Sequence, residues 1–175
     1  MATLTEASLV EMRLVKVVAL AIAEDDPSYV VVLEAVSRDQ VLPIEIGPPE
    51  AFSLAATLTG VELGRPMGPQ FAAGLVRALG GRVRQVRIDR PIPVSGGTAF
   101  GAVVEVEGPA GTQVVDARPS DALNLLALMP APVFAAPEVL AEAAARMEGD
   151  SAEATLLRRA LDLEQMTVRQ RHHHR

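Results

Sequence analysis

The 175-residue chain is 49% apolar but only 3% aromatic, so its length allows one domain with an aliphatic core. No apolar run approaches the about 18 residues of a membrane span, and the N-terminus lacks the features of a signal peptide, which predicts a cytoplasmic protein without a membrane partner. The net charge of -6 argues against a general affinity for nucleic-acid backbones, while a local basic patch stays compatible with it.

Cysteine and histidine usage further limits the kinds of catalytic and metal sites that the chain can form. The chain has no cysteine, which excludes disulfides and thiolate metal sites. Its three histidines are His172, His173 and His174, in a tail predicted over residues 172–175. The predicted folded part therefore has no histidine for Ser-His or Cys-His catalysis, for a general base or for an ordinary zinc site.

The first half of the chain predicts three strands and two helices. Runs rich in β-branched residues predict strands over 11–23, 29–36 and 41–46. Pro48 and Pro49 predict the start of a helix, and Gly60 predicts its end. A second helix is expected over 70–79, where it is closed by two glycines.

The second half repeats this order. Strands are predicted over 83–88, 98–107 and 113–117, with a loop over 91–97. A helix is expected over 120–128, followed by a proline-rich break at 130–132 and a helix that opens at Pro137. Strands joined by hairpin-length connections predict an α+β fold, with mostly antiparallel sheet and helices packed on it.

Two strand-to-helix junctions have matching sequences. Setting Glu50 against Asp121 aligns Glu45 with Asp116, an offset of 71 residues. This internal match predicts a tandem repeat of two strand-strand-strand-helix-helix units. The residues expected to pack the two matching helices on the sheet are Phe52, Leu54, Leu123 and Leu126.

The main domain is expected to span residues 10–148. Residues 149–171 predict a separate C-terminal helix, with Ser151 as its N-cap and leucines along one side. At the level of sequence this helix packs either on the body of the protein or on a neighbouring chain.

Three motifs stand out in the domain. They are Leu42-Pro43-Ile44-Glu45-Ile46-Gly47-Pro48-Pro49-Glu50-Ala51, Arg65-Pro66-Met67 and Asp116-Ala117-Arg118-Pro119-Ser120-Asp121-Ala122. With them the chain resembles the bifunctional nuclease family, also catalogued as a domain of unknown function, over roughly residues 12–145. The resemblance implies an α+β homodimer, with RNase and DNase activity in some members.

The second motif departs from the family pattern. That pattern continues past Arg65 and Pro66 to a His-Asp pair, and this chain has Pro69 and Gln70 in those places. If the pair supplies a general base or a metal ligand in the family, this protein lacks it.

Three carboxylates are the predicted catalytic residues: Glu50, Asp116 and Asp121. Two or more carboxylates can hold a hard cation for phosphodiester hydrolysis, so Glu50 and Asp121 are the predicted ligands of Mg²⁺ or another divalent cation. In the alternative interpretation, acids in a first turn stabilise helix starts, and Asp116 or Asp121 pairs with Arg118. The sequence favours the structural interpretation, because both halves carry the same device.

The arginines allow two interpretations as well. Arg65 and Arg118 either bind substrate phosphate or form salt bridges between the halves. Ser120 has no base beside it and is interpreted as a capping hydroxyl. The one basic run is interpreted as charge that protects a sheet edge, since no aromatics are interleaved to stack bases. It comprises Arg77, Arg82, Arg84, Arg87 and Arg90.

Two functional hypotheses of different class follow. The first is a metal-dependent nuclease acting on RNA or DNA, with weak activity at best. The second is a non-catalytic dimeric module that binds a small anion or a protein partner. A homodimer is predicted because a thin α+β body rich in valine and alanine should leave an apolar face or edge uncovered.

Overall fold

The computed structural model describes residues 9–23, 26–36, 40–95 and 97–149 together with 154, 155 and 158, and of residues 13–23, 26–28 and 97 it describes the backbone alone. The elements in chain order are β1 (Val10–Ala23), β2 (Asp26–Ala35), β3 (Val41–Ile46), α1 (Pro48–Thr59), α2 (Gly68–Ala78), β4 (Arg82–Val94), β5 (Gly97–Gly108), β6 (Gly111–Ala117), α3 (Pro119–Leu128), β7 (Val133–Ala135) and α4 (Pro137–Glu148). The predicted α+β class is confirmed.

The seven described strands form one sheet in the order β3-β2-β1-β7-β4-β5-β6. Strands β1 to β3 make one antiparallel meander and strands β4 to β6 make another. Strand β7 lies between them, antiparallel to β1 and parallel to β4. The sheet is therefore mostly antiparallel, as the hairpin-length connections predict.

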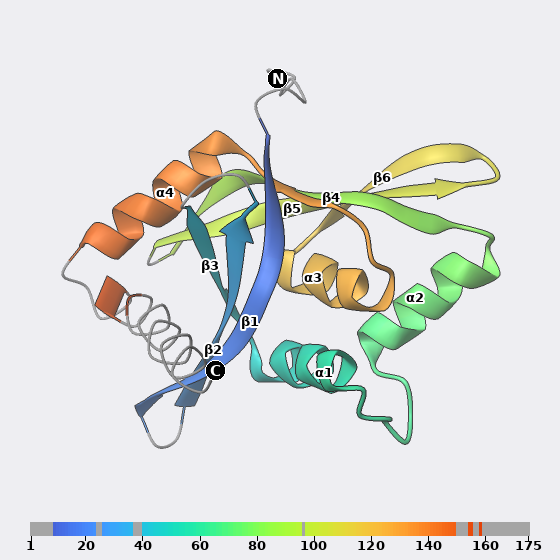
Figure 1. The fold of residues 1–175 in the computed structure, drawn as a ribbon, viewed down its shortest axis with the longest axis horizontal. Coiled ribbons are helices and arrows are strands. Elements are labelled where there is room, and N and C mark those ends of the chain that lie inside the picture. Colours follow the sequence, from blue (N-terminus) through green and yellow to red (C-terminus); the bar gives the residue numbers. More distant parts are fainter. Residues whose placement is uncertain are drawn as a thin grey trace, which may run out of the picture.

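The sheet curls, so the blue strands β1 to β3 run steeply across Figure 1 while the green and yellow strands β4 to β6 lie closer to horizontal. One aliphatic core lies between the sheet and helices α1, α3 and α4. Its fully buried large side chains include Leu33, Leu42, Leu54, Ile88 and Leu123. The alternation along β5 sends Phe100, Ala102 and Val104 into this core, because successive side chains of a strand point to opposite faces.

Helices α1 and α3 begin in the same way. Each has proline at its first position, Pro48 in α1 and Pro119 in α3, and an acid in its first turn. Helix α1 ends at Gly60, whose φ of 70° is the left-handed conformation that glycine adopts most easily. The prolines therefore set where the two motif acids stand.

Three sequence-based predictions are wrong. Strand β4 continues through the predicted loop as far as Val94. Its prolines lie beyond the residues of β4 that pair with β7, so the missing N–H groups of proline cost no hydrogen bond to β7. Strand β7 follows the predicted proline-rich break and is only three residues long, too short for a periodic signal. Phe52 is exposed instead of packing on the sheet, whereas Leu54 and Leu123 are buried as expected.

The two meanders are each followed by a helix, as a tandem repeat requires, but the first half has no counterpart of β7 among the described residues. The repeat therefore stays a prediction. The predicted C-terminal helix over 149–171 and the tail over 172–175 lie outside the described residues, except for 149, 154, 155 and 158. Within the described part, no helix has the length and apolar character needed to cross a membrane.

Candidate functional site

Glu50 and Asp121 meet on one guanidinium. Arg118 Nη2 donates to Glu50 Oε1 at 2.8 Å, while Nε and Nη2 donate to the two carboxylate oxygens of Asp121 at 2.8 and 2.9 Å. Two hydrogen bonds raise the pKa of Arg118 above its already high ordinary value. The bond to Asp121 contributes most, and the bond to Glu50 comes next. We call these three residues the Arg118 cluster; its guanidinium stays charged at any physiological pH.

A buried amide ties the starts of α1 and α3 together beneath the cluster. Asn124 Nδ2 donates to the backbone oxygen of Glu50 at 3.1 Å and to that of Ser120 at 3.0 Å. Asn124 is not among the site residues predicted from the sequence. The available signal was a lone amide in the apolar helix, one turn after Ser120, because a buried polar group needs partners.

A cavity of about 320 Å³ opens beside the Arg118 cluster. The start of α3 forms one side of it, and Arg146 of α4 contributes a second guanidinium. Arg146 lies over the ring of Phe100, 5.4 Å from its centroid, and its Nη2 is 3.9 Å from Glu45 Oε1. The two guanidinium groups and the N-terminus of α3 favour an anion, and the carboxylate of Glu45, which lines the same cavity, offsets part of their charge. No local pattern in the sequence pointed to Arg146, because α4 brings it here from the far end of the domain.

The remaining predicted site residues lie elsewhere. Asp116 accepts a hydrogen bond from Arg90 Nη2 at 2.7 Å, which places its carboxylate on β4 instead of on Arg118. That bond is the first cause that raises the pKa of Arg90. Arg65 is exposed in the bend between α1 and α2, and it makes no ion pair within the described part of the chain. Ser120 is a helical residue behind the N-cap Arg118, and α3 has no side-chain cap, so the capping interpretation is wrong.

Four of the five arginines of the basic run, all except Arg84, form hydrogen bonds or ion pairs with other groups among the described residues. Arg82 pairs with Glu107 at 2.8 Å, Arg87 pairs with Glu105, and Arg77 donates to the backbone oxygen of Leu128. Strand β4 is interior, between β7 and β5. Strand β7 pairs with β4 only over Val86–Ile88, so Arg82, Arg84 and Arg90 lie beside stretches of β4 that β7 leaves unpaired, and the interpretation of this run as protection of a sheet edge stays a prediction.

Glu50 and Asp121 would have to release Arg118 before they could hold a divalent cation. Both carboxylates hydrogen-bond the guanidinium of Arg118, which takes the position that a metal ion would occupy between them. Among the described residues, no group of three or more His, Cys, Asp or Glu side chains is placed to hold a metal. Metal ligation by Glu50 and Asp121 stays a prediction.

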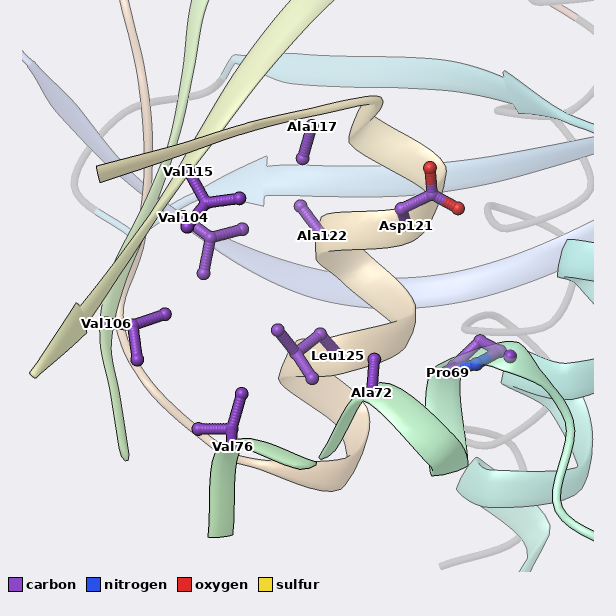
Figure 2. Close-up of a pocket in the computed structure, with 11 residues that line it drawn as sticks. Pro69, Ala72, Val76, Val104, Val106, Val115, Ala117, Asp121, Ala122 and Leu125 are labelled. Atoms are coloured by element: carbon purple, nitrogen blue, oxygen red, sulfur yellow. The ribbon is translucent and has the colours of Figure 1, made fainter. Parts of the chain in front are cut away.

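The second pocket, of about 330 Å³, is almost wholly aliphatic (Figure 2). Helices α2 and α3 and strands β5 and β6 line it, and Asp121 is its one charged lining residue. Pro69, in the place of the family histidine, lines the same pocket. Gln70 instead turns toward α1, where its Nε2 lies 3.4 Å from Ser53 Oγ and Thr57 Oγ1. The position at which the family has histidine thus shares a pocket with Asp121.

Known proteins share the sequence of this domain. The model of the bifunctional nuclease domain matches residues 31–148, more than half of the chain. Two Mycobacterium tuberculosis proteins, uncharacterized protein MT1877 of strain CDC 1551 / Oshkosh and uncharacterized protein Rv1829 of strain ATCC 25618 / H37Rv, are each 30% identical over 139 residues, which is 79% of this chain and 80% of the relative. The match spans both junctions that form the Arg118 cluster, and the chain belongs to the bifunctional nuclease domain family.

Proposed function

We propose that this chain acts on phosphodiester bonds of RNA or DNA at the Arg118 cluster, with cleavage that is weak and depends on a divalent cation. Membership of the family supports the substrate class. The observation that carries the proposal is the meeting of Glu50 and Asp121 on Arg118, which lines a cavity together with a second arginine, Arg146.

Arg118 is suited to hold a phosphate. Its three hydrogen bonds use Nε and Nη2, which leaves Nη1 for a phosphate oxygen, since a guanidinium has five donors. The two carboxylates fix the orientation of the guanidinium before a ligand arrives. Arg146 and the N-terminus of α3 add positive potential from other sides of the cavity. Arg65 stays a predicted phosphate contact.

The same arrangement supports slow cleavage. No histidine precedes residue 172, so proton transfer at the cluster falls to carboxylates. Both carboxylates of the cluster are held by Arg118, and they would have to leave it before binding Mg²⁺ or another divalent cation. Each of these conditions lowers the rate relative to a site with a free base.

The test is cleavage of short single-stranded RNA and DNA by purified protein, with Mg²⁺ or Mn²⁺ and with EDTA. Asp121→Asn should abolish cleavage, and Arg118→Gln should weaken oligonucleotide binding at least about tenfold, because a charged pair to phosphate is lost. Arg82→Gln is the matched control, since Arg82 is also exposed and pairs with a carboxylate at 2.8 Å on a different part of the surface.

Several results would contradict the proposal. Cleavage that persists in EDTA, or in folded Glu50→Gln and Asp121→Asn proteins, comes from another site or from a contaminant. Equal loss of binding in Arg118→Gln and Arg82→Gln would show that binding depends on the total positive charge and not on the Arg118 cluster. Binding without cleavage in the wild type would favour the second hypothesis, a non-catalytic anion-binding module.

A further inference from the structure

The Glu50–Arg118 bond joins two distant parts of the chain, whereas the bonds between Arg118 and Asp121 are local. Asp121 lies three residues after Arg118, so one helical turn brings these two side chains together. Glu50 lies 68 residues before Arg118, at the start of α1. Its side chain is also the most enclosed of the three, with 19% exposed against 47% for Asp121 and 66% for Arg118. The Glu50–Arg118 bond therefore requires that the starts of α1 and α3 keep their relative places.

Gly47 leaves the space that the Glu50 carboxylate fills. It is the N-cap of α1, with φ of -71° and ψ of 160°, an extended backbone that any residue adopts, so glycine is not needed here for its freedom. A Cβ at this position would lie 2.6 Å from Glu50 Oε2, closer than a Cβ approaches an atom to which it is not bonded. Its next neighbours, Glu50 Cδ and Pro49 Cδ, would lie at ordinary contact distances of 3.6 and 3.7 Å. A side chain at position 47 therefore conflicts with the Glu50 carboxylate alone.

The carboxylate is the part that has to move when a side chain is added at position 47. The backbone oxygen of Gly47 accepts a helical hydrogen bond from the N–H of Ala51 at 2.9 Å, so the helix holds the backbone there. The Glu50 carboxylate is the far end of a flexible side chain, which can turn away at little cost. Gly47→Ala therefore takes Glu50 off Arg118, while every charge and hydrogen-bonding group of the Arg118 cluster stays in the chain.

Asn124 fixes the backbone from which Glu50 reaches Arg118. Its Nδ2 group has two hydrogens, enough for one bond to the backbone oxygen of Glu50 and one to that of Ser120. Because the side chain is 1% exposed and packed in the interior, it has little room to turn away from these two oxygens. One amide thus holds a residue of α1 beside a residue of α3, which is the condition that the Glu50–Arg118 bond requires.

We propose that Gly47 and Asn124 are positioning residues, which hold the Glu50 carboxylate on Arg118 and so fix the guanidinium before a phosphate arrives. Gly47 acts by leaving space, and Asn124 acts by holding two backbone segments together. The consequence for substrate binding rests on the proposed function, whereas the effect on the Arg118 side chain itself does not.

The first test observes Arg118 without nucleic acid. In the ¹H–¹⁵N NMR spectrum, the Nε–Hε signal of Arg118 is assigned by its loss in Arg118→Gln. Gly47→Ala and Asn124→Ala should each shift this signal, because Nη2 of the same guanidinium loses its bond to Glu50. Leu33→Ala is the control for general destabilisation and should leave the signal in place, since Leu33 is fully buried and lines neither cavity beside the cluster. An Arg118 signal that Gly47→Ala and Asn124→Ala leave unmoved, or that Leu33→Ala moves as far, overturns the proposal.

The second test measures the binding of a short single-stranded oligonucleotide in EDTA, so that metal-dependent cleavage does not interfere. Gly47→Ala should weaken binding about threefold, the effect of losing one exposed ion pair. The matched control is the same substitution in a Glu50→Ala protein, in which no carboxylate is left to displace, and there it should have no effect. Since Gly47 lines the cavity, equal weakening in both backgrounds would mean that the added methyl group meets the substrate directly, and it would overturn the proposal. A wild type that binds no oligonucleotide contradicts the proposed function, and the NMR test then decides the positioning role by itself.

Discussion

Strands β3 and β6 are the outer strands of two similar meanders, yet one is buried and the other is exposed. In β3, Leu42, Ile44 and Ile46 belong to the core, whereas in β6 both valines stand in solvent. The difference lies in the helices: α4 packs on β3 and β4, while α2 contacts α3 and leaves an aliphatic pocket in front of β6. Burial of an outer strand is thus decided by the helix that covers it.

The largest effect should come from removing a buried side chain of β3. Leu42→Ala should lower the free energy of unfolding by about 2–5 kcal/mol, because it leaves a cavity in the core. Val115→Ala on β6 should change it by less than about 0.5 kcal/mol in the dissociated chain. Urea unfolding at low protein concentration measures both. A similar cost for the two substitutions would mean that β6 is covered even in the single chain.

Asn124 connects the two halves, and its loss should have the next largest effect. Asn124→Ala should destabilise the protein by about 1–3 kcal/mol, because a buried hydrogen bond to Ser120 and a partly buried one to Glu50 disappear. Gln70→Ala is a suitable comparison, since its amide contacts are long at 3.4 Å, and it should cost less than about 1 kcal/mol. Thermal unfolding would distinguish them. A harmless Asn124→Ala would show that the helix starts are held by packing alone.

The open side of the molecule is also where the family pattern has its histidine. Pro69→His places an imidazole on the pocket that Asp121 lines, and it should raise cleavage at least about tenfold, because a general base then becomes available. Pro66→His introduces the same group in the same connection but outside that pocket. Initial rates on a labelled oligonucleotide compare the two. Equal rates in both variants would show that a histidine in this pocket does not take part in cleavage.

Only a small effect on stability is expected at Asp116. Asp116→Asn removes an exposed pair with Arg90 and should cost less than about 1 kcal/mol, since surface salt bridges contribute little. Cleavage should be retained if the Arg118 cluster alone carries the activity. Loss of cleavage in a stably folded Asp116→Asn protein would instead support the prediction from the sequence that Asp116 is catalytic.

Local signals in the sequence predicted most elements, because prolines, glycines and periodic side chains act on their own neighbours. They placed β3 at 41–46 and ended α1 at Gly60, as observed. They also predicted that an acid pairs with Arg118, which Asp121 does. They missed β7, the exposure of Phe52 and the role of Arg146. Each of these depends on which distant segment lies alongside, and this information is absent from a short stretch of sequence.

Strand β7 has a consequence for how the chain reaches its fold. Residues 133–135 are the seam of the sheet, pairing with residues 10–12 of β1 on one side and 86–88 of β4 on the other. The ribosome synthesises both meanders before β7, so the edge of each meander that pairs with β7 stays unpaired until residues 133–135 have been made. Closing loops of this length is slow, and waiting edges are exposed to wrong partners. Because β7 lies between β1 and β4, the two meanders can join into one sheet only after residues 133–135 have been made.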